Sequence, residues 1–264
     1  MDRTSRKPTL ALIGAGAFGT FCIPHLRPFF DLCLHDARPD LELVAARHGV
    51  RAAGLGDAAR ADVVVLAVPL AALAQVADAI APLLRPGALV VDVCSLKVRP
   101  AEILAERLPA HVGIVGTHPL FGPQSGRDGI AGLRAVVCRV RGGRDAMVAR
   151  FLRRLGLDVQ RTDAHRHDRQ MAYVQGLTHL LSRVVLDMDL PPLDQTTATF
   201  GHLMRMVETV RHDSDALFRT IVMDNPYAAE MRNRLRESVL RLTEDPCAAP
   251  RGDATAPAGH RSAA

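Results

Sequence analysis

The sequence has no tryptophan and only two tyrosines among its 264 residues. Proteins that bind nucleic acid commonly combine aromatic side chains, on which bases stack, with clustered arginines and lysines. The net charge here is +5, but the basic residues are scattered among acidic ones. Such a charge is typical of a solvated surface or of attraction for small anions. We therefore expect no nucleic-acid partner.

Long apolar runs are also missing, since no segment approaches the roughly 18 consecutive apolar residues that a membrane span requires. The N-terminal segment MDRTSRKPTLALIGAG joins basic residues to an apolar run. That run is short and broken by glycine, and no small-residue cleavage site follows it. We therefore expect neither a membrane partner nor a signal peptide.

Cysteine is sparse, and its five positions form no paired spacing. An odd number without paired spacing provides neither a disulfide framework nor a zinc site. The sequence thus predicts no metal and a cytoplasmic location, where thiols stay reduced. The cysteines are Cys22, Cys33, Cys94, Cys138 and Cys247.

What the sequence does contain is an ordinary globular composition, 48% hydrophobic and 23% charged, and a regular alternation of elements. Strands are predicted at 8–13, 32–36, 62–69, 88–95, 111–118, 133–140 and 157–162. Helices are predicted at 17–30, where Pro24 and Pro28 shorten the helix, and at 71–84, 100–108 and 146–156. Strands that alternate with helices indicate an α/β fold with a parallel sheet covered on both faces.

The pattern changes after Asp163, where helical periodicity continues without any strand signal. Helical segments are predicted at 167–188, 195–211, 213–223 and 227–243. We expect a Rossmann-type doubly wound parallel sheet in a dinucleotide-binding domain, 1–162, and an all-α substrate and dimerisation domain, 163–246. The small, polar, proline-bearing segment 247–264 is expected to be a disordered tail.

A glycine motif follows the first predicted strand. The run Gly14-Ala15-Gly16-Ala17-Phe18-Gly19 matches G-x-G-x-x-G between a strand and a helix. Its first glycine allows a tight turn, its second lets the backbone approach a pyrophosphate, and its third permits close packing of helix and strand. We expect Gly14, Gly16, Ala17, Phe18 and Gly19 to bind a dinucleotide.

An acidic residue, Asp36, lies 22 positions after Gly14 at the end of the second predicted strand. This is near the spacing of about 20 at which a carboxylate accepts hydrogen bonds from the adenosine ribose. A carboxylate there repels a 2′-phosphate, which favours NAD. Arg38 lies two residues further on and offers a partner to that phosphate, so NADP stays open as the alternative.

Polar groups and prolines stand at the ends of three later strands: Val68-Pro69, Ser95 and His118-Pro119. In a doubly wound sheet the ligand crevice lies beyond the carboxyl ends of the strands. We expect Val68 and Pro69 to border the cofactor, and Ser95 and His118 to be catalytic. Taken alone, Ser95 is as well explained as a turn or helix cap, and His118 as a structural histidine.

Together these strand ends carry a resemblance. The stretches DVCSLK, THPLFGPQSG, HDRQMAY, THLLSR and MVETVRHDSDALFRTIV resemble the prephenate/arogenate dehydrogenases of tyrosine biosynthesis. The likeness runs from about residue 8 to 240 and is nearest to plant-type arogenate dehydrogenases at 116–133 and 178–183. Leu120 departs from the family pattern, in which methionine is usual, although the two side chains are similar in volume.

The resemblance implies an oxidoreductase that oxidises the C4 hydroxyl of prephenate or arogenate, transfers hydride to NAD, and releases the ring carboxylate as carbon dioxide. It assigns His118 as the base that takes the hydroxyl proton, and Ser95 as the group that holds the hydroxyl or His118 in position. Lys97 is expected near the cofactor or the crevice rim, where it would bind substrate. The alternative for Lys97 is a solvated side chain.

A polar stripe marks the predicted helix 167–188. Gln175, His179 and Arg183 are spaced four residues apart and so share one face of an otherwise apolar helix. The stripe either binds a dianionic substrate or forms a polar network between subunits. The surplus apolar surface of this helical part indicates a homodimer.

Three other functions remain open. A second enzyme hypothesis is another two-domain Rossmann dehydrogenase, such as a 3-hydroxyacid dehydrogenase or an imine reductase, although those lack the pairing of Ser95 with His118. A third is a related enzyme of secondary metabolism that acts on an amino-substituted prephenate analogue. The non-enzyme hypothesis is a nucleotide-binding sensor that has lost turnover.

Overall fold

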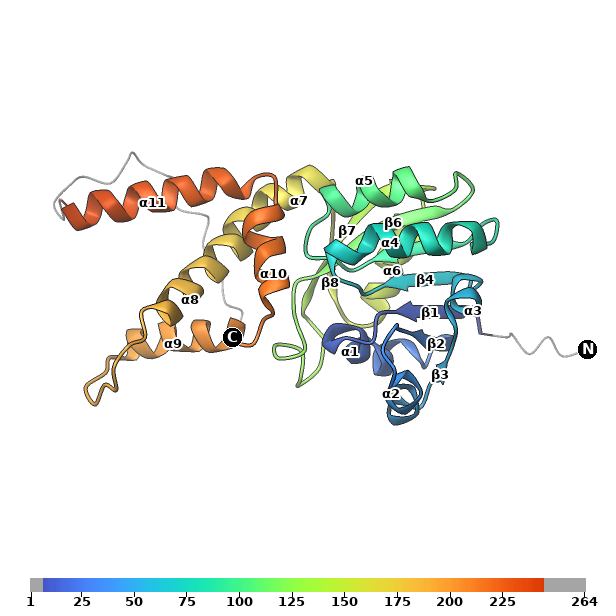
Figure 1. The fold of residues 1–264 in the computed structure, drawn as a ribbon, viewed down its shortest axis with the longest axis horizontal. Coiled ribbons are helices and arrows are strands. Elements are labelled where there is room, and N and C mark those ends of the chain that lie inside the picture. The colour runs from blue at the N-terminus through green and yellow to red at the C-terminus, as the bar shows by residue number, and fades with distance from the viewer. Residues whose placement is uncertain (1–6, 245–264) are drawn as a thin grey trace, which may run out of the picture.

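The computed structural model describes residues 7–244, which form an eight-stranded sheet flanked by helices and a separate group of helices (Figure 1). The strand order is β3-β2-β1-β4-β5-β6-β7-β8. The strands are β1 (Thr9–Ile13), β2 (Asp31–His35), β3 (Arg51–Ala52), β4 (Val63–Leu66), β5 (Leu89–Asp92), β6 (Gly113–Pro119), β7 (Arg134–Arg141) and β8 (Asp158–Thr162).

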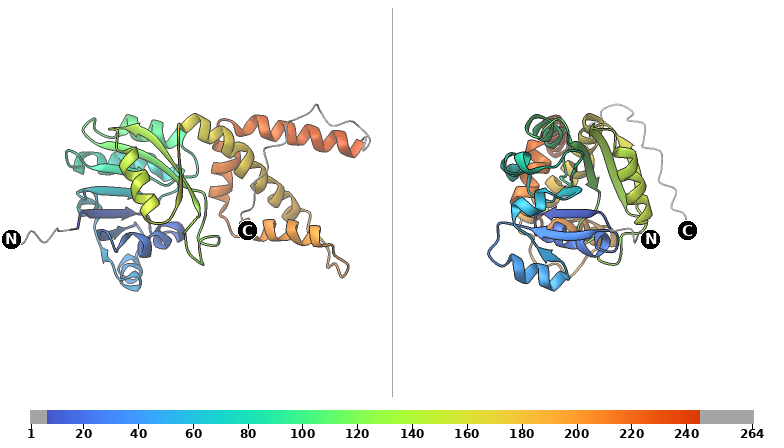
Figure 2. Two further views of the ribbon diagram at one scale, coloured as in Figure 1. Left: turned by 180° about the vertical axis from the view of Figure 1, so that it is seen from behind. Right: turned by 90° about the vertical axis from the view of Figure 1, so that its right-hand side faces the viewer.

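Helices cover both faces of the sheet, as the Rossmann-type prediction requires. One apolar core packs the strands against α3 (Leu55–Ala59), α4 (Leu70–Ile80) and α5 (Val98–Arg107). The other packs them against α1 (Ala17–Leu26), α2 (Leu41–His48) and α6 (Asp145–Arg154). In Figure 1, α4 and α5 lie in front of the sheet, and α6 comes to the front when the molecule is turned in Figure 2. A short 3-10 turn, Ala81–Leu83, ends α4.

The doubly wound parallel sheet is confirmed from β3 to β6, whereas β7 runs antiparallel to β6. Two adjacent strands that are parallel need a crossover connection, which is usually a helix. Residues 120–133, which connect β6 to β7, form turns instead. The chain therefore reverses direction, and β8 then pairs parallel to β7. This reversal leaves the loop 120–133 at the carboxyl end of β6, beside the expected site.

Several short elements between β2 and β4 are absent from the sequence prediction. They are α2, the two-residue β3 and the five-residue α3. Each is too short for apolar periodicity to identify it. The prediction of a short first helix is confirmed, because α1 ends at Leu26 between Pro24 and Pro28.

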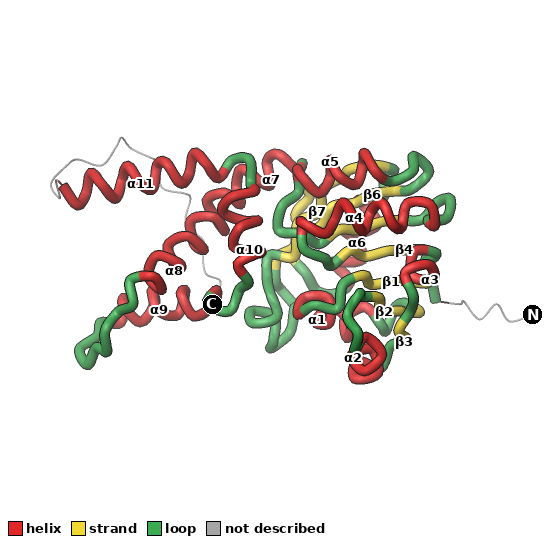
Figure 3. The backbone as a smooth tube through the Cα atoms, in the orientation of Figure 1, coloured by secondary structure: helices red, strands yellow, loops and turns green. Residues whose placement is uncertain are grey.

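The described residues after the sheet are helical, and Figure 3 shows every strand in one half of the molecule. The predicted helix 167–188 consists of α7 (Ala164–Met171), a π-helical turn, η2 (Ala172–Leu177), and α8 (Thr178–Asp187). The remaining elements are α9 (Ala198–Val210), α10 (Asp215–Arg219), a second π-helical turn, η3 (Thr220–Asp224), and α11 (Ala228–Glu244).

Within residues 7–244, no helix combines the length and the apolar character that crossing a bilayer demands. The predicted tail 247–264 lies outside the described residues.

Candidate active site

The carboxyl ends of four neighbouring strands lie level with one another. Ile13 of β1 pairs with Leu66 of β4, Leu66 pairs with Asp92 of β5, and Asp92 pairs with Gly116 of β6. Ser95 and His118 follow Asp92 and Gly116 by three and two residues. The glycine turn, Ser95 and His118 therefore stand at one edge of the sheet, where ligand crevices of such folds lie.

The glycine turn has the close backbone packing that its motif predicts. Gly14 has φ +113°, and a Cβ there would lie 2.2 Å from the carbonyl oxygen of Ala67. A Cβ on Gly19 would lie 2.0 Å from the carbonyl oxygen of Gly14, whereas a Cβ on Gly16 would meet nothing within 4 Å. The first and third glycines are thus needed for packing. The second leaves open space at the N-terminus of α1, a cradle that suits a pyrophosphate.

Asp36 lies against this turn. One carboxylate oxygen accepts a hydrogen bond from the Ala15 backbone N–H at 2.7 Å, and the other accepts one from the Arg38 backbone N–H at 3.0 Å. A carboxylate has about four acceptor sites, so the ribose hydroxyls still find free lone pairs. The Arg38 guanidinium pairs with both oxygens of Asp40, at 2.5 and 2.8 Å, which already engages the cation that a 2′-phosphate would need.

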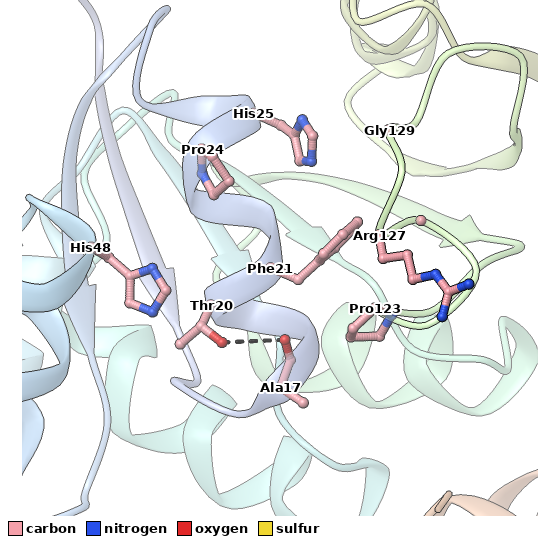
Figure 4. A pocket seen from close by; sticks show the side chains of 10 residues that line it. Ala17, Thr20, Phe21, Pro24, His25, His48, Pro123, Arg127 and Gly129 are labelled. Atoms are coloured by element: carbon pink, nitrogen blue, oxygen red, sulfur yellow. Dashed lines mark hydrogen bonds between the residues drawn. The ribbon is translucent and has the colours of Figure 1, made fainter.

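A cavity of about 490 Å³ lies between α1 and the loop 122–129. Figure 4 shows Phe21 pointing from α1 toward the loop segment that carries Pro123 and Arg127. A Cβ on Gly126 would lie 2.6 Å from the tip of the Phe21 ring, so this glycine lets the loop approach α1 closely. Because Ala17 also lines it, the cavity adjoins the glycine turn.

His118 is 3% exposed and lies under the helical part of the chain. Its Nδ1 lies 2.9 Å from Nε2 of His167, and its Nε2 lies 3.4 Å from the Gln175 side-chain nitrogen. Burial, together with the nearby His167 and Lys97, holds the pKa of His118 well below its usual value of 6.5. His118 is therefore neutral at physiological pH, the form in which an imidazole accepts a proton.

Asp168 continues the contacts of His167. Its Oδ1 lies 2.7 Å from Nδ1 of His167 and accepts a hydrogen bond from the Lys97 backbone N–H at 2.8 Å. Its Oδ2 accepts the Val98 backbone N–H at 2.9 Å. Asp168 thus caps the start of α5, the helix that follows Ser95, and connects that helix to His118 through His167.

The expected position of Lys97 at the crevice rim or in solvent is wrong. Its side chain is 1% exposed, and its Nζ contacts Oδ1 of Asp92 and donates to the carbonyl oxygen of Thr117 at 2.6 Å. Gly116 provides the room, because a Cβ there would lie 3.3 Å from Cδ of Lys97. Lys97 therefore joins the ends of β5 and β6 from inside the protein, and its expected contact with the substrate stays a prediction.

Ser95 is half-buried and lies just before α5. Among the described residues its hydroxyl makes no hydrogen bond, and no contact joins it to His118. The shared edge of the sheet brings the two residues to the same region. Their direct pairing stays a prediction.

The structure separates the three members of the polar stripe. Gln175 lies in η2 beside His118, and its Oε1 is buried without a hydrogen-bond partner among the described residues. Further along, His179 Nε2 contacts Asp213 Oδ2 at 3.1 Å, and Arg183 donates to Asp215 at 2.9 Å. His179, Arg183 and Asp213 line a second cavity of about 90 Å³. His179 and Arg183 therefore face acidic residues of the same chain, whereas Gln175 faces His118.

Three residues of this region were not identified as candidates from the sequence: His167, Asp168 and Asp213. The first two belong to the stretch HDRQMAY and Asp213 belongs to MVETVRHDSDALFRTIV, so the family resemblance marked their segments without giving them a role. Their roles depend on contacts with residues 49 and 71 positions away, which no local pattern shows. Among the described residues, no group of three or more histidine, cysteine or acidic side chains is placed to hold a metal.

Comparisons with known proteins give matches both in sequence and in fold. The family model for the nucleotide-binding domain of prephenate dehydrogenase matches residues 29–133. Arogenate dehydrogenase 2 of Arabidopsis thaliana is 34% identical over 159 residues, which are 58% of this chain and 44% of that protein. The chain thus spans less than half the length of this plant relative. The 4-amino-4-deoxyprephenate dehydrogenase of Streptomyces pristinaespiralis is 31% identical over 202 residues, 74% of this chain and 66% of that one.

Solved structures share the fold at low sequence identity. Prephenate dehydrogenase from A. aeolicus, solved with hydroxyphenyl propionate and NAD+, superimposes with a TM-score of 0.74 at 17% identity. The match covers 92% of this chain and 91% of that one. Synechocystis arogenate dehydrogenase gives a TM-score of 0.67 at 18% identity, over 90% and 93% of the two chains.

Proposed function

Because this chain belongs to the prephenate/arogenate dehydrogenase family, we propose that it catalyses the NAD-dependent oxidative decarboxylation of a cyclohexadiene substrate, prephenate or arogenate. One observation carries the proposal. A buried, neutral imidazole, that of His118, stands at the same sheet edge as a glycine turn shaped for a dinucleotide. A reaction that removes a hydride from carbon and a proton from oxygen needs these two features side by side.

The cofactor would be held by the turn from Gly14 to Gly19, with the pyrophosphate at the N-terminus of α1 and the ribose at Asp36. When bound, NAD supplies the carbon that receives the hydride. Asp36 and the engaged Arg38 guanidinium favour NAD over NADP, because a 2′-phosphate would meet the Asp36 carboxylate and would have to compete with Asp40 for the Arg38 guanidinium. Val68, at the end of β4 against Gly14, would border the cofactor together with Pro69.

The substrate would lie between this edge and the helices that follow the sheet. His118 Nε2 accepts the proton of the C4 hydroxyl as the hydride leaves C4, and the ring carboxylate then departs as carbon dioxide with aromatisation of the ring. Ser95 would hold the hydroxyl in the reacting geometry, where small displacements cost large factors in rate. Gln175, His179 and Arg183 would bind the polar groups of the substrate.

A second candidate substrate carries an amino group in place of the C4 hydroxyl, as in the name of the Streptomyces pristinaespiralis relative. Gln175 is the observation in its favour. Its Oε1 is a buried acceptor without a partner among the described residues, and it belongs to the side chain that contacts His118. An amine has two hydrogens, so it is able to donate to His118 Nε2 and to Gln175 Oε1 together.

The test is an absorbance assay of nicotinamide reduction with purified protein. We expect NAD to be reduced with at least one of prephenate, arogenate and 4-amino-4-deoxyprephenate, and NADP to be reduced more slowly at equal concentration. Release of one carbon dioxide per NADH would establish decarboxylation. Absence of NADH formation with all three substrates would contradict the proposed function.

We also propose a homodimer formed through the helical part. Within residues 7–244, eleven large apolar side chains are exposed, and nine of them follow residue 163. Helix α11 extends away from the sheet in Figure 1, and only Ala228 and Met231 of its 17 residues are buried. A second copy packed on these helices would cover that surface. The nine are Tyr173, Val174, Val184, Met188, Leu193, Met223, Val239, Leu240 and Leu242.

Sedimentation equilibrium measures this association. We expect twice the mass of one chain, and a shift toward the single-chain mass in Leu240→Glu, because a carboxylate would be buried without a partner. Leu43→Glu is the matched control, since Leu43 is equally exposed but lies on α2, away from the helical part. A single-chain mass for the unmodified protein at micromolar concentration would refute the dimer.

Two further assignments accompany the proposal. Residues up to 162 would form the dinucleotide-binding domain, and the helices from 163 would provide substrate binding and dimerisation. A cytoplasmic location is supported by four free thiols, Cys22, Cys33, Cys94 and Cys138, which a reducing compartment maintains. Labelling of all five cysteines, Cys247 included, by a thiol reagent in unfolded protein isolated from cells would agree with it, and their oxidation would not.

A further inference from the structure

A chain of hydrogen bonds leads away from the side of His118 that does not face Gln175. It passes from His118 Nδ1 to His167 Nε2, at 2.9 Å, and from His167 Nδ1 to Asp168 Oδ1, at 2.7 Å. All three side chains are buried, with exposures of 3%, 1% and 0%. Buried polar groups of this kind make full use of their donors and acceptors, so the positions of the protons follow from the contacts.

Asp168 determines which atom donates and which accepts in each of these hydrogen bonds. Its two oxygens already accept the backbone N–H groups of Lys97 and Val98, at the positive N-terminal end of α5, which favours the ionised carboxylate. An ionised carboxylate only accepts hydrogen bonds. The proton between Asp168 and His167 therefore belongs to His167 Nδ1.

The tautomers of both imidazoles follow from this assignment. A neutral His167 with its proton on Nδ1 presents a lone pair at Nε2, so His118 must donate from Nδ1. The lone pair of His118 then lies on Nε2, the atom beside the Gln175 side-chain amide. The nitrogen of that amide lies 3.4 Å from this atom.

A positive charge on His118 itself is poorly accommodated. Burial, the nearby His167 and the neighbouring Lys97 hold the pKa of His118 well below its usual value, and within residues 7–244 no carboxylate forms a hydrogen bond or ion pair with its ring. His167, one hydrogen bond further on, has a carboxylate in direct contact. The imidazole next to Asp168 is thus the better place for the charge.

We propose that His167 and Asp168 are positioning residues that keep Nε2 of His118 free of a proton and receive the charge when His118 acts. Proton transfer from the substrate breaks an O–H bond and forms Nε2–H on His118. The Nδ1–H bond of His118 then breaks as Nε2–H forms on His167, which leaves the charge beside Asp168. No electrons change hands in this step, and the reverse sequence returns the proton to water after product release.

The segment that carries the two residues is held in place from a second side. Asn225, itself 2% exposed, donates from Nδ2 to the backbone carbonyl of Asp168 at 2.8 Å. Asp168 is therefore fixed through its backbone by the turn after η3 and through its carboxylate by α5. Such rigid support is what a group needs when it orients a reacting side chain.

The test compares two substitutions of His167. Only its kinetic part depends on the proposed function. His167→Leu removes the acceptor for His118 Nδ1, and we expect kcat to fall roughly 100-fold, within the range that general-base catalysis supplies. His167→Gln keeps an acceptor but cannot take up a proton, so we expect a fall of roughly tenfold. KM and NAD affinity should not change, and His165→Gln, exposed on the same helix, should match the unmodified enzyme.

The second readout is the ¹⁵N spectrum of histidine-labelled protein without substrate, with His118 assigned from its loss in a His118→Asn variant. We expect the His118 proton on Nδ1 in the unmodified protein and in His167→Gln, and substantial protonation at Nε2 in His167→Leu. Thermal melting shows whether each variant is folded. An Nε2 proton in the unmodified protein, or normal kcat in folded His167→Leu, would overturn the proposal. Absence of turnover in the unmodified protein would instead count against the proposed function, and the spectrum would still decide the tautomer.

Discussion

His118→Asn is expected to lower kcat by roughly 10³-fold, because it removes the group that takes the hydroxyl proton, and general-base catalysis supplies about 10²- to 10⁴-fold. Asparagine still places a polar atom near His167, so the neighbouring hydrogen bonds are preserved as far as a shorter side chain allows. Affinity for NAD should stay unchanged, because the glycine turn and Asp36 directly follow β1 and β2, whereas His118 lies on β6. Steady-state kinetics and NAD titration measure the two quantities separately.

His111→Asn is the matched control for this variant. His111 precedes the opposite end of the same strand, β6, and is exposed, with only a 3.3 Å contact to the carbonyl oxygen of Leu84. Its substitution should leave kcat within about twofold of the unmodified enzyme, as for a surface change away from the site. Comparable kcat in His118→Asn and His111→Asn would remove His118 from the assigned role.

The pH profile of the unmodified enzyme follows from the direction of the His118 shift. The neutral imidazole is the active form, and its pKa lies well below 6.5. Activity should therefore persist as the pH falls through 6.5, and it should decline only when the pH reaches the lowered pKa.

Lys97→Met is expected to destabilise the protein by about 3–5 kcal/mol, the usual cost of removing one partner from a buried ion pair. Both side chains of the Asp92–Lys97 pair are 1% exposed. Burial raises the pKa of Asp92, although Lys97 opposes that rise. Without Lys97, the carboxyl group must either stay charged without its cation or take up a proton. Urea unfolding measures the loss.

The pH dependence and a double variant distinguish this cause from a packing defect. The folded-state pKa of Asp92 rises further when Lys97 is removed, so the stability deficit should be small in acid and should grow as the pH rises. Asp92→Asn combined with Lys97→Met removes the unpaired charge and should recover part of the loss. A deficit that is independent of pH and unchanged in the double variant would show that the ion pair is not its source.

The sheet was predictable from the sequence because buried parallel strands are short apolar runs that end at glycine, proline or a polar group. The glycine motif was equally predictable, since its first and third glycines are required by close backbone packing and its second leaves open space at the helix N-terminus. The antiparallel β7 was not predictable, because strand direction depends on how residues 120–133 cross the sheet edge. Periodicity reports that a segment is a strand and does not report which way it runs.

The site was predictable only in part, for a related reason. The placement of His118 and Ser95 at one edge of the sheet was predictable because strand ends share that edge in this fold class, whereas their catalytic roles stay predictions. The burial of Lys97 was not predicted, because a lysine side chain is normally solvated. Its contacts with Asp92 and with the Thr117 carbonyl offset the free-energy cost of burying its charge, and these contacts are visible only in the three-dimensional structure. The pairing of His167 with His118 joins a helix to a strand 49 residues earlier, which local pattern cannot reveal.

The most direct measurement for the whole account is a crystal structure of the protein with NAD and a substrate analogue. We expect C4 of the nicotinamide, Nε2 of His118 and the hydroxyl of Ser95 to border one cleft at the carboxyl edge of the sheet, with the pyrophosphate on the Gly14–Gly19 turn. A nicotinamide ring on the far side of the sheet, or one separated from His118 by the protein interior, would contradict the account.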